Sequence, residues 1–271
     1  MNKSYSRKIT LASCAFHIKT GEEYTMPYHF DAALKGGFEG FELSFIPGGK
    51  AVDLLNAAKT AQVDICAVHG LMNANACSKD KSLRDRAFEE AYHYLETFAE
   101  FAPCPIIEHY WSRYNDPDMG KYFRDTVSRL LEKTEEYGFY LCMENAPYKP
   151  EENERYPDIA EVADFIKSFD GRMYMTFDVN HANLNEDIIY AVKRSKGLIR
   201  HIHISDNHGH REEHLVPGQG VIDLQTVIAE IYKTDYNGPY NFEFVFPKGF
   251  TAKAKDYKQI YDYIRILTNR S

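Results

Sequence analysis

The stretch Thr176-Phe-Asp178-Val-Asn-His181-Ala, followed further along by His201-Ile-His203-Ile-Ser-Asp206-Asn, decides the fold and the kind of site to expect. Each stretch runs from a short apolar strand into carboxylate and imidazole side chains. Alternation along a strand places His201 and His203 on one face, where one of the two would only fill the interior. Acids and histidines at the ends of consecutive strands predict a divalent-metal site at the mouth of a parallel barrel.

Two further carboxylates stand in the same kind of position. Glu144 follows Leu-Cys-Met, and Glu243 lies between two phenylalanines. A carboxylate among buried apolar residues is costly unless it is paired, hydrogen-bonded or bound to a metal. For Glu144, the alternative is a side chain that merely begins a surface loop. Asp178 and His181, three residues apart after a strand, are expected to face the same mouth.

Short apolar runs alternate with helical patterns along the chain. Strands are expected at residues 9–15, 40–43, 64–68, 105–107, 140–143, 173–177, 199–204 and 240–244. Helical periodicity lies between them, for example over residues 82–101 and 122–137, and Asp158 and Asp223 are placed to begin helices. Eight strands alternating with helices predict an α/β fold, a (β/α)8 TIM barrel that forms a single domain over residues 1–271. A doubly wound sheet is the alternative, but no Gly-x-Gly-x-x-Gly turn follows any strand.

Composition narrows the class of protein. The 271 residues suit one such barrel, which needs about 250 residues. The net charge of −8 disfavours a nucleic-acid partner, because binding to phosphate backbones usually requires a basic face. The five cysteines are scattered without a Cys-x-x-Cys pair, which favours reduced thiols and a cytoplasmic protein. Neither a signal-peptide core nor an apolar run of about 20 residues is present, so no membrane association is expected.

The donor set at the strand ends indicates which metal and which chemistry to expect. Three carboxylates and one imidazole favour one hard, oxygen-preferring divalent ion; Mn2+ is favoured, and Mg2+, Co2+, Zn2+ or Fe2+ would also fit. Such an ion could chelate the carbonyl and adjacent hydroxyl oxygens of a small polar substrate. A carboxylate on either side could then move a proton between neighbouring carbons.

Several motifs resemble those of the xylose-isomerase-like TIM-barrel superfamily. They are Gly36-Gly-Phe-Glu-Gly-Phe-Glu-Leu, Cys142-Met-Glu-Asn-Ala, Phe177-Asp-Val-Asn-His, His201-Ile-His-Ile-Ser-Asp-Asn, Glu213-His-Leu-Val-Pro-Gly-Gln-Gly-Val-Ile-Asp and Asn241-Phe-Glu-Phe. They occur in family order over nearly the whole chain. The superfamily includes sugar-phosphate isomerases and epimerases, inosose dehydratases and isomerases, and family-2 apurinic/apyrimidinic endonucleases.

In the ketose-epimerase branch, the resemblance implies that the metal ligands are Glu144, Asp178, His203 and Glu243. Glu144 and Glu243 would also be the two acid/base groups, and His181 would bind a substrate oxygen. Those epimerases usually carry an arginine six residues after the strand-seven histidine, where this chain has Gly209. The resemblance therefore implies an isomerase or epimerase acting on a sugar, sugar phosphate or keto-inositol, with a dehydratase of inosose or dehydroshikimate as an alternative. Barrels of this kind often form homo-oligomers.

In the endonuclease branch, the resemblance implies a trinuclear zinc site and a phosphodiesterase. The chain offers His69, His109 and the Glu212-Glu-His214 run as the additional ligands. Glu212 replaces the usual aspartate, and Glu-His109-Tyr-Trp replaces a small-residue His-Pro-Gly run. In a sugar enzyme, His69, His109 and His214 would instead bind hydroxyls or phosphate at the mouth.

Two further positions complete the predicted mouth. Glu42 ends the second strand and is expected to contact substrate, with a structural role as the equal alternative. Trp111, the single tryptophan, is expected to stack on a sugar ring. His208 and His210 are expected to belong to a solvated polar loop, whereas His214 stands nearer an apolar turn.

Overall fold

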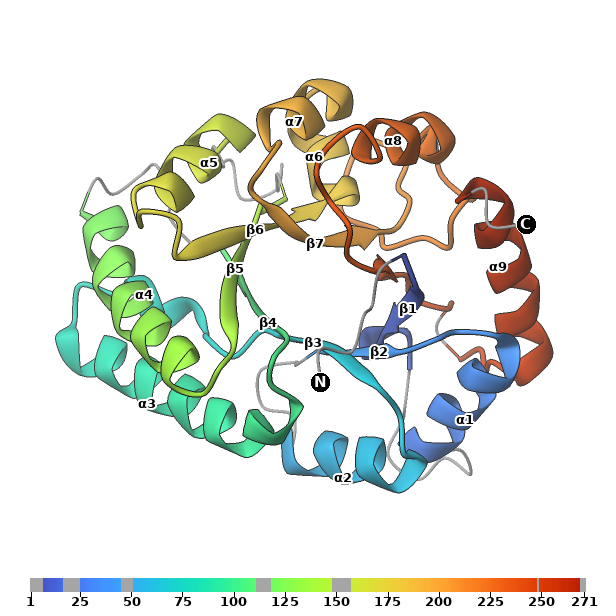
Figure 1. Ribbon diagram of the computed structural model, residues 1–271, viewed down its shortest axis with the longest axis horizontal. Helices are drawn as coiled ribbons and strands as arrows, with labels where there is room; N and C mark the ends of the chain where they lie inside the picture. The colour runs from blue at the N-terminus through green and yellow to red at the C-terminus, as the bar shows by residue number, and fades with distance from the viewer. Residues whose placement is uncertain are drawn as a thin grey trace.

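The computed structural model describes residues 7–16, 25–44, 51–110, 118–147, 157–247 and 249–268. Within them, eight parallel strands close into a barrel in chain order, and the last strand pairs with the first (Figure 1). The strands are β1 (Ile9–Ala12), β2 (Phe41–Ser44), β3 (Ile65–His69), β4 (Pro105–His109), β5 (Tyr140–Glu144), β6 (Met173–Asp178), β7 (Ile199–Ile204) and β8 (Tyr240–Phe242). The predicted TIM barrel is confirmed.

A ring of helices surrounds the barrel (Figure 1). The helices are α1 (Met26–Gly36), α2 (Ala51–Ala61), α3 (Lys81–Phe98), α4 (Met119–Glu136), α5 (Ile159–Lys167), α6 (Val179–Asn185), α7 (Ile188–Arg194), α8 (Leu224–Ile231) and α9 (Ala254–Leu267). Short 3-10 turns lie in the described parts of the connections, namely η1 (Ser13–Ala15), η2 (Ala74–Cys77) and η3 (Ala99–Phe101). The extra helix α6 begins directly after β6, so it carries His181 at the barrel mouth.

The strands differ from the expected ranges mainly at their ends. β1 stops at Ala12 because the next three residues turn into η1. β8 stops at Phe242, which leaves Glu243 one residue beyond the strand. By contrast, β3, β4, β5 and β6 extend to include their terminal His or acidic residue. The polar side chains therefore belong to the carboxyl ends of the strands, where the barrel wall holds them rigidly.

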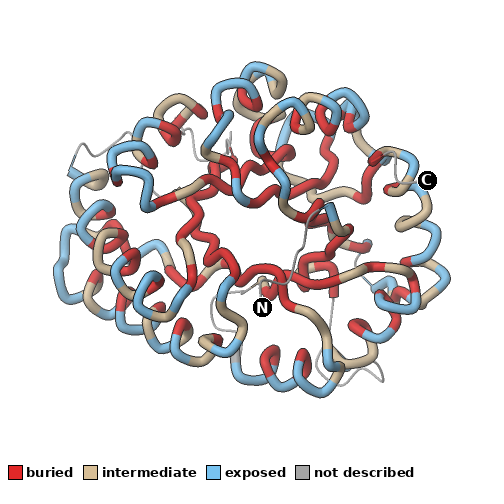
Figure 2. Tube along the Cα trace, viewed as in Figure 1, coloured by how far each residue is buried: buried red, intermediate tan, exposed pale blue. Residues whose placement is uncertain are grey.

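Each helix buries one apolar face against the barrel, as its sequence period predicts. In α4, Phe123, Val127 and Leu130 are fully buried, and Gly138 follows the helix with a φ of +79°. The expected starts are also confirmed: Asp158 forms a capping box with Glu161, and Asp223 accepts a hydrogen bond from the Thr226 amide. Figure 2 shows the resulting pattern, in which the strands are buried and the helices expose only their outer faces.

Two properties bear on the class of protein. All five cysteines are reduced; Cys66, Cys77, Cys104 and Cys142 are buried, and Cys14 is half-buried. Among the described residues, no helix combines the length and apolar character needed to cross a bilayer.

The seam between the first and last helices depends on a glycine. α1 packs against α9, and a Cβ added at Gly36 would overlap the Cβ of Tyr257, a fully buried residue of α9. We expect Gly36→Ala to lower the free energy of unfolding by about 1–3 kcal/mol, since the two helices must separate. Denaturant unfolding measures this change. Lys35→Ala, an exposed neighbour, is the control and should shift stability by less than about 0.5 kcal/mol; equal losses in both variants would contradict the packing argument.

Candidate metal centre

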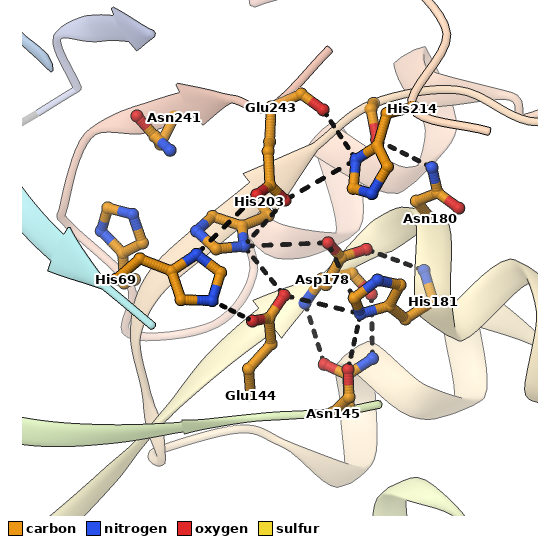
Figure 3. Close-up of polar contacts among 12 residues, drawn as sticks. His69, Glu144, Asn145, Asp178, Asn180, His181, His203, His214, Asn241 and Glu243 are labelled. Atoms are coloured by element: carbon orange, nitrogen blue, oxygen red, sulfur yellow. Dashed lines mark hydrogen bonds and ion pairs between the residues drawn. The ribbon is translucent and has the colours of Figure 1, made fainter. Parts of the chain in front are cut away.

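Four side chains converge at the carboxyl ends of the last four strands. Glu144 ends β5, Asp178 ends β6, His203 lies in β7, and Glu243 follows β8 (Figure 3). His203 Nδ1 lies 2.9 Å from Glu144 Oε1, 3.2 Å from Glu243 Oε2 and 3.8 Å from Asp178 Oδ2. Each residue offers one donor atom within 4.8 Å of the other three. The four ligand positions implied by the epimerase branch are therefore brought together.

The barrel geometry explains this convergence. In the strand register, Asp178 pairs with His203, and Glu144 pairs with Thr176 two residues before Asp178. Parallel strands all end at the same rim, so residues that are distant in sequence become neighbours there. The rim is dry at this point: Glu144, Asp178 and His203 are fully buried, and Glu243 is 6% exposed.

The donor set fits a divalent cation. Glu144 Oε2, Asp178 Oδ2 and Glu243 Oε2 are buried and have no hydrogen-bond partner among the described residues. Burying carboxylate oxygens without a hydrogen bond is costly, and a divalent ion would satisfy all of them at once. Three carboxylates with one imidazole suit Mn2+ or Mg2+, and also Zn2+, Co2+ or Fe2+.

The electrostatics of the protein groups point the same way. Burial opposes a charge on His203, but Glu243, Glu42 and Glu144 outweigh it and hold the pKa of its ring well above the ordinary value. Burial raises the pKa of Asp178 to about 7. Burial also opposes the charge on Glu144, but nearby histidines, first His203, hold the pKa of that carboxyl well below its usual range. Without a metal, protons on His203 and Asp178 therefore offset the negative charge that a cation would otherwise offset.

A carboxylate beneath His203 fixes the orientation of its ring. Glu42 is fully buried, and its Oε2 lies 2.9 Å from both His203 Nε2 and His201 Nε2. Asn241 Nδ2 donates to the same oxygen at 3.0 Å. The pKa of Glu42 lies well below its ordinary value because the charge of His203 outweighs burial, so the carboxylate is ionised and both ring nitrogens that face it must donate. His203 Nδ1 is then the nitrogen left for the metal centre.

A first flanking group lies on the side of β3 and β4. His69 Nε2 is 3.1 Å and His109 Nε2 is 3.3 Å from Glu144 Oε2. These three residues form a second set of donors close enough to hold an ion. Burial lowers the pKa of His109 to about 4, so this ring is neutral and offers a lone pair. Glu144 is thus shared by two donor sets.

A second flanking group lies on the side of α6 and the loop after β7. Glu212 Oε1 is 3.3 Å from His181 Nε2 and 2.8 Å from His214 Nε2. The Nδ1 atoms of the two rings lie 2.7 Å from the Asn145 carbonyl and 3.0 Å from the Glu243 carbonyl, which can only accept. Both Nδ1 atoms therefore donate, and both Nε2 atoms face Glu212. Burial opposes charge on these rings, but Asp178 and Glu212 raise the pKa of His181 to about 10, and Glu212 with Glu243 raises that of His214 to about 9.

The remaining predicted positions are distributed as follows. Trp111 lies outside the described residues. Glu42 is under the centre, where its partners are His201 and His203, and contact with a substrate stays a prediction. His208 and His210 are exposed, as expected for a solvated loop, and His208 pairs with Glu213.

Two polar residues at the rim were not predicted as part of the site. Asn145 joins β5 to β6, since its amide accepts from the Asp178 N–H at 2.9 Å and donates to the Asp178 carbonyl at 3.0 Å. Glu108 accepts hydrogen bonds from the Leu71 and Met72 amides just after β3, and burial raises its pKa to about 7. A glutamate after two buried isoleucines was the available signal for Glu108. Asn145 gave none beyond its place next to Glu144.

Comparison with known proteins agrees with this fold. Residues 30–267 match the family described as xylose isomerase-like TIM barrel. The chain belongs to this family. Two uncharacterized proteins of Methanocaldococcus jannaschii are similar: MJ1311 is 26% identical over 168 residues, and MJ1614 is 34% identical over 99 residues. These matches cover 60% and 36% of this chain and 55% and 37% of the relatives.

Solved structures of epimerases share the fold over nearly the full chain. A D-tagatose 3-epimerase-like protein aligns with a TM-score of 0.73 at 21% identity, covering 97% of this chain and 98% of the other. The D-psicose 3-epimerase of Clostridium cellulolyticum H10 aligns with a TM-score of 0.76 at 18% identity, covering 96% and 99%. An L-ribulose 3-epimerase aligns with a TM-score of 0.76 at 15% identity, covering 97% and 95%.

Metal binding at the centre is expected to release protons. His203 and Asp178 hold protons near neutral pH, because their pKa values are raised, and both must lose them to act as ligands. The affinity for Mn2+ should therefore rise with pH, by up to about tenfold per pH unit for each proton displaced. Calorimetric titrations at several pH values and in buffers of different ionisation enthalpy measure both effects. A dissociation constant that is independent of pH would contradict this electrostatic description.

The role of Glu42 beneath His203 gives a second prediction. Glu42→Gln removes the negative charge that the His201 and His203 rings share at Oε2 and leaves one accepting oxygen in place of two, so the His203 ring is held less firmly. We expect the affinity for Mn2+ to fall by about 10–100-fold while circular dichroism is unchanged. Glu39→Gln, two residues before the same strand begins, is the matched control and should bind Mn2+ like the wild type. Equal affinity in both variants would exclude the orienting role.

Proposed function

We propose that this protein is a divalent-metal-dependent isomerase or epimerase of a sugar, sugar phosphate or keto-inositol, and that it moves a proton next to a carbonyl. The observation that supports this most strongly is the pair of buried carboxylates, Glu144 and Glu243, at the candidate centre. They come from different strands, and in Figure 3 they approach His203 from opposite directions. Two such groups are what a proton transfer between the faces of a planar carbon centre requires.

The two carboxylates would have different access to water. A divalent ion held by Glu144, Asp178, His203 and Glu243 would polarise a substrate carbonyl and an adjacent hydroxyl. Glu144 is fully buried, whereas Glu243 is 6% exposed. A proton taken up by Glu144 would therefore stay out of contact with solvent. A proton on Glu243 would exchange with water at the barrel mouth. This asymmetry suits one base that removes a proton and one acid that returns a proton on the other face.

The flanking groups would bind the substrate. His181 and His214 direct Nε2 toward Glu212 on one side of the centre, and His69 and His109 direct Nε2 toward Glu144 on the other. Imidazoles and carboxylates in fixed orientation are suitable partners for sugar hydroxyls. The related structures named as epimerases of tagatose, psicose and ribulose support a ketose as the first substrate class to test.

The two flanking groups also favour a second candidate function, a zinc-dependent phosphodiesterase acting on abasic DNA. The sets His69–His109–Glu144 and His181–Glu212–His214 each have the size of a metal site and lie on either side of the central set. Several ions sharing bridging carboxylates can clamp a phosphodiester and its attacking water. The net charge of −8 suits binding to DNA poorly. Cleavage of a duplex oligonucleotide with one abasic site, in the presence of Zn2+, tests this function.

The isomerase proposal predicts a specific loss in Glu243→Gln. With Mn2+ in D2O, wild-type protein should interconvert a ketose from a panel of D-psicose, D-tagatose, L-ribulose and D-fructose, with uptake of solvent deuterium at one carbon. Replacing the acid/base group should lower kcat/KM by about 10²–10⁴-fold, because the amide cannot exchange a proton. Chromatography and NMR measure product and deuterium.

Glu213→Gln is the matched control. Its carboxylate contacts His208 and Arg211 and not the centre, so turnover should stay within about threefold of the wild type. Wild-type turnover in Glu243→Gln would remove Glu243 from the mechanism. Product formed without deuterium uptake would argue against proton transfer next to the carbonyl.

A further inference from the structure

The loop between β7 and α8, residues 207–222, carries Glu212 and His214 over the barrel mouth. We propose that Asp206 is the positioning residue for this loop: its buried carboxylate gathers backbone amides from the far end of the loop and so sets Glu212 and His214 against His181. This inference rests on the proposed function only for the role of the loop in substrate binding. The hydrogen bonds by which Asp206 holds the loop all lie among described residues and do not depend on that function.

The Asp206 carboxylate is fully buried and accepts four backbone hydrogen bonds. Oδ1 accepts from the amides of Asn207 at 2.9 Å and Ile222 at 3.1 Å. Oδ2 accepts from the amides of Gly218 at 3.0 Å and Gly220 at 2.9 Å. Three of the four donors lie 12 to 16 residues further along the chain, so one side chain joins the two ends of the loop.

The backbone of Asp206 makes a second connection to the same loop. Its amide donates to the Leu215 carbonyl at 3.0 Å, and the Leu215 amide donates to the Asp206 carbonyl at 2.8 Å. This short antiparallel bridge places Leu215 directly beside Asp206. His214, the preceding residue, accepts from the Val245 amide through its carbonyl at 2.8 Å. The His214 backbone is therefore fixed between β7 and the segment after β8.

Only a carboxylate satisfies this arrangement. Four N–H donors converge on two oxygens, and an asparagine would turn an NH2 group toward two of them. Gly220 has no room for a side chain, because a Cβ there would overlap Asp206 Oδ1 and the Asn207 carbonyl. The glycine at position 220 and the carboxylate of Asp206 are thus both required for this contact. Asn207 and Ile222 are buried, and a buried amide left without an acceptor is costly, so loss of the carboxylate should open the loop.

The next residue ties the loop to α6, which carries His181. The Asn207 amide group donates to the Asn180 carbonyl at 2.9 Å, and its oxygen accepts from Asn183 Nδ2 at 2.7 Å. The start of the loop and His181 are therefore fixed to one another. Asp206 fixes the end of the loop to that same point, and Glu212 Oε1 then lies between His181 Nε2 and His214 Nε2.

Asp206→Asn tests the proposal with three readouts, taken on the Zn2+-loaded full chain. Amide hydrogen exchange at Gly218, Gly220 and Ile222 should be about 100-fold faster, with exchange in β7 and β8 unchanged. The ring NMR signals of His181 and His214 should shift, while that of His203 stays in place. On a ketose turned over by the wild type, KM should rise about tenfold with kcat within about threefold, because Glu144 and Glu243 lie outside the loop.

Two further variants complete the test. Asp223→Asn is the matched control, because asparagine caps a helix as well as aspartate, and it should leave all three readouts unchanged. Gly220→Ala should reproduce the faster exchange and the ring shifts while Asp206 keeps its charge. Wild-type exchange at the three amides in Asp206→Asn would overturn the proposal. Equal acceleration in β7 and β8 would also overturn it, since Asp206 would then support only the barrel. The first two readouts need no substrate, so they are independent of the proposed function.

Discussion

One constraint governs this structure: three carboxylates are buried around a single imidazole nitrogen. Glu144, Asp178 and Glu243 direct oxygens toward His203 Nδ1, and each has one oxygen without a hydrogen-bond partner among the described residues. Like charges so close together and so deeply buried need a compensating positive charge. In the protein alone, protons on the surrounding groups, among them His203 and Asp178, supply this compensation. A divalent ion supplies the same compensation more completely, and this is why the site is read as a metal centre.

The rest of the structure serves to maintain this constraint. Closure of the barrel brings β5 through β8 to one rim, so Glu144, Asp178 and His203 stand on strands and Glu243 follows directly after one. Glu42 lies beneath His203 and fixes which ring nitrogen faces the centre. Above it, Asn145 and the loop held by Asp206 place imidazoles around the mouth. Glu42 thus supports the ligands from below, and the imidazoles surround them at the mouth where a substrate would bind. In each group the polar side chains have a fixed orientation.

The sequence alone predicted the barrel and the gathering of acids and histidines at its rim, because both are local signals. Apolar runs mark the strands, and a single acid or histidine at the end of a run marks the rim. Three features depend on contacts between distant residues and were not predicted. Glu42 reaches His203 across the barrel interior. Glu212 meets His181 only after the loop folds back. Asp206 looked like a residue at which a strand gives way to a loop, since its donors, Gly218, Gly220 and Ile222, lie further along the chain.

Metal content per chain is the decisive measurement for this centre. Elemental analysis should be made on wild-type protein and on His203→Gln, both purified without a chelator or an affinity metal. The account predicts about one equivalent of Mn2+ or another divalent ion in the wild type and its loss from a folded His203→Gln variant. A folded, metal-free wild type that also fails to take up added Mn2+ would contradict the metal centre. Two to three zinc ions per chain would contradict the single-ion account and favour the phosphodiesterase.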